Sequence, residues 1–149
     1  MGLLNFAITG IAEAIAKIAT AVTKLAVIEH EAVEETGQIL AEKMRDLAPV
    51  DEGALKGSIT VINEGPEAVL VGPTVDYALY VEFGSRPHWP PAANVEGWAS
   101  RHGMSTYGLQ SLIAKQGTHA HPFIQPAIEQ ARPEVESKLV GQFAAVSLI

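Results

Sequence analysis

With 149 residues, 48% of them hydrophobic, the chain is long enough to bury a core without covalent cross-links. It contains no cysteine, which excludes disulfide bonds and thiolate metal sites. Ten basic residues against seventeen acidic ones give a formal net charge of −7, which disfavours nucleic-acid binding as the main activity. An acidic wall past which DNA slides without binding is compatible with this charge.

The N-terminal third predicts a long amphipathic helix, because its apolar residues recur at gaps of four and three. This seam comprises Leu4, Ile8, Ile11, Ile15, Ile18, Val22 and Leu25. Glu13, Lys17 and Lys24 break the apolar run, so it falls short of the roughly 18 residues of a membrane span. Residues 1–12 lack the positive charge of a secretory signal. We expect the seam to pack within the chain; contact between helices of neighbouring protomers is the alternative.

A second apolar stripe, on a shifted face, continues the helical pattern to residue 47. It comprises Val33, Leu40, Met44 and Leu47. A continuous helix over residues 3–47 would be about 67 Å long, at about 1.5 Å per residue, which exceeds the width of a domain of this size. We therefore expect either that part of it projects toward another copy or that it breaks into two helices. Gly37 is the weak point at which it would bend or break.

The next part of the chain predicts a turn, a hairpin and an ambiguous segment. Pro49 ends the helix, and Asp51 is placed to cap the turn that follows. Residues 58–63 and 68–71 are rich in β-formers and predict a hairpin. Residues 77–83 alternate like a strand but also fit a helical turn, so both interpretations stay open.

The last part predicts a loop followed by helices. Residues 85–93 contain three prolines and predict an extended loop, and residues 94–102 and 107–115 predict two short helices. A C-terminal helix begins near residues 125–126, and Pro133 predicts either a kink in it or a new start. Its apolar stripe comprises Ile128, Ala131, Val135, Leu139, Phe143 and Val146.

Three separated segments together resemble a known family. They are residues 48–59 (APVDEGALKGSI), 77–85 (YALYVEFGS) and 121–127 (HPFIQPA). Their order and spacing resemble the tail-completion, or head–tail joining, proteins of long-tailed bacteriophages, which are also described as neck or minor tail components. The resemblance covers roughly residues 45–139. This chain departs from it at Glu52 and Ser85, where the family commonly has Thr.

The resemblance implies an α+β fold, in which a long N-terminal helix and a C-terminal helix pack on a small antiparallel sheet beside a short helical insertion. We expect one domain over residues 1–149, with a helical region to residue 47 and a body from residue 48. The resemblance also implies a non-enzymatic virion protein without cofactor, which resides in the host cytoplasm before it assembles as a ring, commonly sixfold, at the head–tail junction. Its partners would be itself, the head connector or stopper, and tail-tube or tail-terminator proteins, while DNA passes through the channel without specific binding. A tail-terminator or a head-side stopper or adaptor ring is the alternative within this class.

Clustered aromatics indicate where the ring interface lies. Tyr77, Tyr80 and Phe83 are three of the chain's nine aromatic residues (two Trp, three Tyr and four Phe), and such density is typical of interfaces. Core packing is the alternative, and we favour it for Phe83 and for Phe123, which two prolines flank. The residues predicted to form the interface are Tyr77, Tyr80, Glu82, Phe83, Arg86, His88, Trp89 and Phe123, together with the N-terminal seam.

Catalytic or metal chemistry is the alternative from another class. His119 and His121 form an HxH pair that, with a third ligand, would suit a small zinc-dependent enzyme or regulator; His88 and His102 lie upstream. No serine lies in a Gly-x-Ser-x-Gly elbow. Glu82, without an evident carboxylate partner, is better explained as a salt-bridge or capping residue than as a catalytic acid. We therefore assign no catalytic, cofactor or metal site.

The two short helices around Gly103 superficially suggest a helix-turn-helix. Arg101, His102 and Lys115 are too few to clamp DNA phosphates, and the negative net charge opposes it. A helical insertion on the ring is the favoured interpretation.

Overall fold

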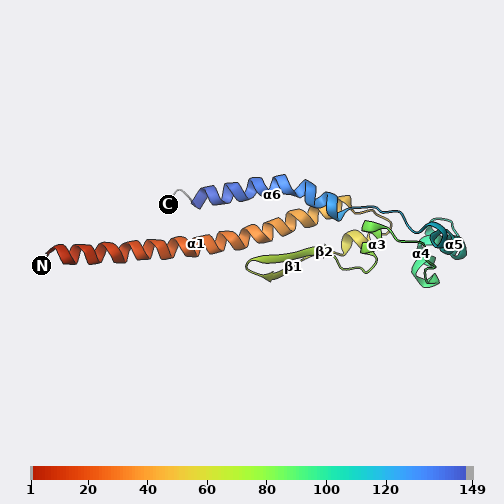
Figure 1. The fold of residues 1–149 in the computed structure, drawn as a ribbon, viewed down its shortest axis with the longest axis horizontal. Helices are drawn as coiled ribbons and strands as arrows, with labels where there is room; N and C mark the ends of the chain where they lie inside the picture. The colour runs from red at the N-terminus through yellow and green to blue at the C-terminus, as the bar shows by residue number, and fades with distance from the viewer. Residues whose placement is uncertain (1, 147–149) are drawn as a thin grey trace. The chain divides into compact units, whose positions relative to one another are not determined.

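The computed structural model describes the backbone of residues 2–146 and the side chains of residues 12–144. The elements are α1 (Gly2–Leu47), α2 (Ala54–Gly57), β1 (Ile59–Gly65), β2 (Ala68–Pro73), α3 (Ala78–Phe83), α4 (Ala92–Arg101), α5 (Thr106–Gln116) and α6 (Ile124–Val146) (Figure 1). The two strands form an antiparallel sheet. The predicted α+β fold is therefore confirmed, with its hairpin, its long first and last helices and its helical insertion.

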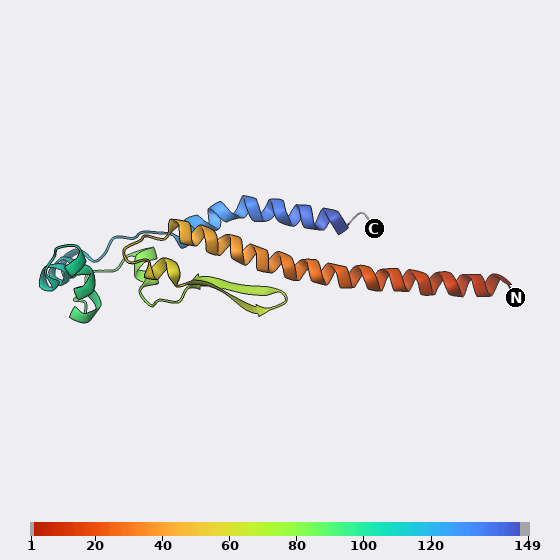
Figure 2. The ribbon, with the colours of Figure 1, turned by 180° about the vertical axis from the view of Figure 1, so that it is seen from behind.

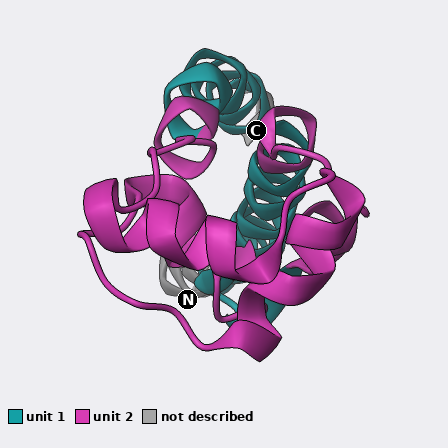
Figure 3. Ribbon diagram, turned by 90° about the vertical axis from the view of Figure 1, so that its right-hand side faces the viewer, with its two compact units in different colours: residues 1–43, 60–71, 128–149 teal, residues 44–59, 72–127 magenta. Residues whose placement is uncertain are grey.

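The chain divides into two compact units, shown in different colours in Figure 3. The first contains residues 1–43, 60–71 and 128–149, and the second contains residues 44–59 and 72–127. The single domain expected from the sequence stays a prediction.

In the first unit, the hairpin and α6 both lie along α1, as Figures 1 and 2 show from opposite sides. Lys43 forms an ion pair with Glu134 at 3.3 Å. About two helical turns before Lys43, Glu35 forms an ion pair with Lys138 and accepts a hydrogen bond from Gln142 at 3.0 Å. These contacts fix α6 antiparallel to the C-terminal half of α1.

Gly37 lies where the hairpin packs closely against α1. A Cβ atom on Gly37 would lie 2.9 Å from Cγ2 of Val69 and 3.0 Å from Cγ1 of Val61. The helix runs unbroken through this position, so the alternative of two separate helices is excluded. The glycine instead gives two β-branched side chains room to contact the helix backbone.

The N-terminal half of α1 leaves its apolar seam uncovered. The exposed fractions are 61% for Ile15, 64% for Ile18, 61% for Val22 and 37% for Leu25. The expectation that this seam packs within the chain is therefore wrong for these four residues. The other seam residues, Leu4, Ile8 and Ile11, lie outside the described side chains, as does Val146 of the last helix.

Helix α6 continues through Pro133, so a new helix start at that residue is excluded. Segment 77–83, ambiguous in the sequence, forms α3. In the second unit, Val95 and Ala99 of α4 form a buried apolar cluster with Leu109 and Ile113 of α5. Among the described residues, no helix is both long and apolar enough to cross a bilayer.

Candidate interface around helix α3

Helix α3 is held against the segment that leads into α6. Just after α3, the chain forms an antiparallel bridge with this segment, in which the backbone N–H groups of Ser85 and Thr118 each donate to the other residue's carbonyl at 3.2 Å. The N–H of His121 donates to the carbonyl of Val81 at 2.7 Å. Two stretches more than 30 positions apart therefore run side by side.

Glu82 points into this junction and caps α6. Its Oε2 accepts hydrogen bonds from the N–H groups of Phe123, at 2.7 Å, and Ile124, at 2.9 Å, while its Oε1 accepts one from Gln125 at 3.0 Å. The first N–H groups of a helix have no acceptor within the helix. Pro126 has no N–H, and the N–H of Ala127 already donates to the carbonyl of Phe123 at 3.3 Å. Every backbone donor at the start of α6 is thereby satisfied.

The ionised form of Glu82 is favoured in this position. Burial raises the pKa of its carboxyl, but the three backbone N–H donors outweigh burial and hold the pKa below its ordinary value. The positive end of the α6 dipole acts in the same direction. Glu82 is only 3% exposed, so its prediction as an interface residue is wrong, whereas its alternative explanation as a capping residue is confirmed.

The aromatic residues of this region face different environments. Tyr77, Tyr80 and Phe83 are exposed, Phe83 by 75%. Core packing, which we favoured for Phe83, is therefore wrong, whereas Phe123 is fully buried and belongs to the core. The fixed helix α3 thus presents aromatic side chains outward, and their contact with another protein stays a prediction.

The loop over residues 86–91 is attached to α5. Trp89 meets Tyr107 edge to face, with 5.7 Å between ring centroids, and Gln110 donates a hydrogen bond to the carbonyl of Pro90 at 2.9 Å. Arg86 and His88 are exposed, and Nδ1 of His88 lies 2.8 Å from the carbonyl oxygen of Arg86. Arg86, His88 and Trp89, all predicted interface residues, therefore lie on the surface of the second unit.

An open groove of about 740 Å³ adjoins α3 in the second unit. It is lined by the turn after α1, by α2, by α4 and by residues 118–121. Tyr77 and Tyr80 line it, whereas Phe83 and Trp89 do not. The structure therefore brings only part of the predicted interface to this groove.

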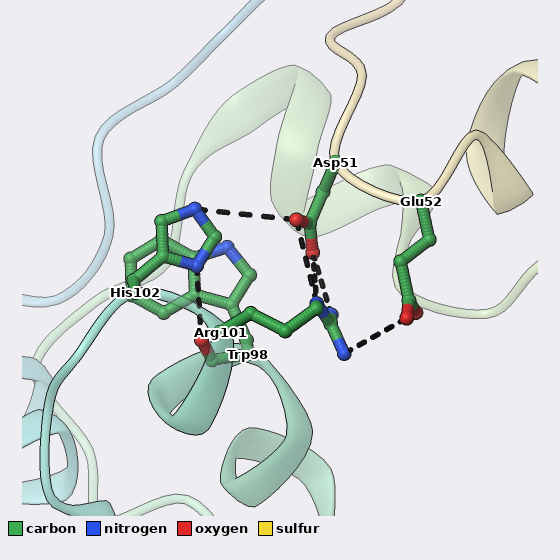
Figure 4. A network of polar contacts seen from close by, with 5 residues as sticks. All are labelled: Asp51, Glu52, Trp98, Arg101 and His102. Atoms are coloured by element: carbon green, nitrogen blue, oxygen red, sulfur yellow. Dashed lines mark hydrogen bonds and ion pairs between the residues drawn. The ribbon is translucent and has the colours of Figure 1, made fainter.

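A polar network that the sequence did not predict lies at the groove (Figure 4). Arg101 donates to Asp51 Oδ2 through Nε, at 3.1 Å, and through Nη2, at 2.5 Å, and its Nη1 lies 3.2 Å from Glu52. The rings of Trp98 and His102 stack with centroids 3.8 Å apart. The hydrogen bonds from Arg101 hold the pKa of Asp51 below its ordinary value.

This network corrects the role expected of Asp51. Helix α2 begins after Gly53 and has no side-chain cap, so Asp51 does not cap the turn. The carboxylate instead fixes the turn after α1 to the C-terminal end of α4. Only the spacing of Trp98 and His102, one helical turn apart, signalled part of this network. Asp51 and Arg101 lie 50 positions apart, and nothing local in the sequence joins them.

The histidines do not assemble into a metal centre within the described residues. His102, His119 and His121 all line the groove, but no three His, Cys, Asp or Glu side chains of the described part lie close enough to hold a metal ion. His119 and His121 are exposed. The zinc alternative would require further ligands beside His119 and His121.

Comparison with known protein families places part of the chain. Residues 12–84 match the family model described as "Bacteriophage HK97-gp10, putative tail-component". The matched stretch contains most of α1, the hairpin and the whole of α3, and it ends at the glycine that follows α3. No curated protein and no solved structure matches the chain.

Proposed function

Through residues 12–84 the chain belongs to the HK97-gp10-like tail-component family of bacteriophages, and we propose that it forms a ring at the head–tail junction. Membership makes the chain a phage tail component and places it in the virion. In the proposed ring, one face of each subunit contacts the head connector or stopper and another contacts the tail tube or tail terminator. The role is geometric and involves no catalysis.

The observation that carries this proposal is the outward-facing aromatic cluster of α3. Tyr77, Tyr80 and Phe83 are 45%, 60% and 75% exposed, although α3 is fixed by the buried Glu82 on its other side. Exposed aromatics on a rigid element bind a partner with little loss of side-chain entropy. Such a cluster is what a subunit needs in order to hold a neighbour.

The hairpin supports the same conclusion. Ile62 of β1 and Leu70 of β2 are 49% and 58% exposed, while Val61 and Val69 face α1. A two-stranded sheet leaves its edges unpaired and is marginally stable alone. A neighbouring subunit would cover both the apolar face and the edges.

The charge of the chain suits a channel that passes DNA. Its net charge is −7, and Arg101, the basic residue at the end of α4, is already paired with Asp51 and Glu52. A channel wall of this kind offers few cations to hold phosphates. We therefore expect DNA to move through the ring without specific binding.

Native mass spectrometry over a concentration series, with negative-stain images of the largest species, tests the proposal. We expect a closed ring with an open centre, and we expect the double variant Tyr80→Ser/Phe83→Ser to dissociate at concentrations where the unmodified chain is assembled. Leu112→Ser, which alters an exposed apolar residue of α5, is the matched control and should leave the ring intact. A chain that stays monomeric both alone and after mixing with purified tails would overturn the proposal.

A further inference from the structure

We propose that residues 12–28 of α1 assemble with the same segment of other copies into a closed barrel of helices. The proposal starts from the uncovered seam of Ile15, Ile18, Val22 and Leu25. With Ile15 and Val22 at heptad position a, Ile18 and Leu25 occupy position d. This is the pattern of helices that supercoil around helices of the same repeat.

The positions beside the seam decide how many helices meet. In a two-stranded coil, positions e and g are commonly Glu and Lys. Here positions e and g hold the residues Ala12, Ala14, Ala19, Ala21, Ala26 and Ile28. At about 100° per residue, positions g, d, a and e together span an arc of about 160°. No charged residue lies in this arc between residues 12 and 28.

In a contact between two helices, only positions a and d, at the centre of this arc, are buried. Positions e and g, at its two edges, would stay exposed. Positions a and e can face one neighbour while positions d and g face the other. This head-to-tail arrangement is the one that closes a ring, because every subunit then uses two different faces. Alanine at e and g also keeps the flanks small enough for neighbouring helices to approach closely.

Several polar side chains of the segment make their contacts within the helix itself. The hydroxyls of Thr20 and Thr23 donate to the carbonyls of Ala16 and Ala19, at 2.9 and 3.0 Å. Glu13 and Lys17 form an ion pair within the helix at 3.6 Å. These groups lie at positions b, c and f, on the side opposite the seam. The seam is thus neutral and self-complementary, so identical copies meet there without repulsion despite the net charge of the chain.

The inference rests on the proposed function, because both need several copies around one axis. Engineered cysteines test it cleanly, since the chain has none of its own. In a parallel barrel, position g of one helix lies beside position e of its neighbour five residues later. In the full-length double variant Ala14→Cys/Ala19→Cys, oxidation should therefore produce a ladder of cross-linked species up to the complete ring. A two-stranded coil would close both bridges on one partner and give dimers only, which would overturn the barrel.

Charge substitutions provide the second measurement. Ile15→Asp/Val22→Asp should shift the native mass to smaller assemblies, whereas Val27→Asp, at an exposed f position on the other side, should not. A ring that persists in Ile15→Asp/Val22→Asp, without a ladder in the cysteine variant, would overturn the barrel and leave the proposed function standing. Absence of any oligomer in the unmodified chain would count against the proposed function itself. Binding of the seam to anionic vesicles without self-association would overturn the inference by assigning this face to a membrane.

Discussion

Oε2 of Glu82 accepts a hydrogen bond from the backbone N–H of Phe123 at 2.7 Å, although 41 positions separate the two residues. This contact joins two of the segments on which the family resemblance depends, residues 77–85 and 121–127. The buried glutamate and the backbone of the buried phenylalanine therefore form one hydrogen-bonded junction. It sets the position of the exposed aromatics of α3 relative to the start of α6, both within the second unit.

Replacement of Glu82 should destabilise the second unit. In Glu82→Gln, an amide N–H₂ takes the place of one carboxylate oxygen and faces a backbone donor instead of accepting from it. Loss of these charge-assisted hydrogen bonds should lower the free energy of unfolding by about 1.5–3 kcal/mol, measured by urea denaturation. Glu96→Gln, on the exposed surface of α4, is the control and should change it by less than about 0.5 kcal/mol. Equal effects of the two substitutions would contradict the capping role.

The same carboxylate predicts a pH dependence with a defined sign. The pKa of Glu82 in the folded protein lies below its ordinary value of 4.5, so the folded state favours the ionised form. Its contribution to stability is therefore complete above about pH 4.5 and is lost as the pH falls through the folded pKa. The difference in free energy of unfolding between the unmodified chain and Glu82→Gln should be constant at neutral pH and should shrink on acidification below this value. Asp51 titrates in both proteins, so its effect cancels in the difference. If this difference in free energy of unfolding grew at low pH, the folded state would favour the protonated form of Glu82, contrary to the prediction.

Much of this fold follows from short-range pattern. The gaps of four and three predicted α1, and the β-rich stretches around residues 65–67 predicted the hairpin. The burial of Glu82 and the exposure of Phe83 were not predictable in this way, because neighbouring residues on one short helix face opposite environments. Which face is buried depends on a segment that arrives some 40 residues later, and periodicity carries no information about it.

The bridge between Ser85 and Thr118 predicts a severe effect of substitution at Gly117. This glycine has φ +74°, and a Cβ atom there would lie 1.9 Å from the carbonyl oxygen of Ser85. Gly117→Ala should lower the free energy of unfolding by more than about 3 kcal/mol, since backbone atoms must move. Gly103→Ala is the control that measures the cost of the backbone conformation alone. Gly103 also has a positive φ, +67°, but no atom lies within 4 Å of the position of its added Cβ. It should cost only about 1–2 kcal/mol. Similar losses for both variants in urea denaturation would show that the bridge is not tightly packed.

The close approach of the hairpin to α1 predicts opposite effects of one substitution at two helical glycines. Alanine is normally favoured over glycine inside a helix by about 1 kcal/mol. At Gly37, however, the new Cβ would lie 2.9 Å from Val69 and 3.0 Å from Val61, and β-branched side chains have little freedom to move aside. Overpacking of this kind costs about 1–3 kcal/mol, so Gly37→Ala should lower the free energy of unfolding despite its better helix propensity. Gly141→Ala, in α6 with nothing within 4 Å, should raise it by about 0.5–1 kcal/mol.

A double-mutant cycle locates the cause of the Gly37 effect. In a Val69→Ala background, the nearer of the two contacts is removed, so Gly37→Ala should become less destabilising there. The coupling between the two substitutions, measured from thermal unfolding of the four proteins, should be at least about 1 kcal/mol and favourable. If Gly37→Ala stabilises the unmodified chain as Gly141→Ala does, the glycine is not required for packing. The hairpin would then lie farther from α1 than 2.9 Å implies, and the side-by-side arrangement within the first unit would need revision.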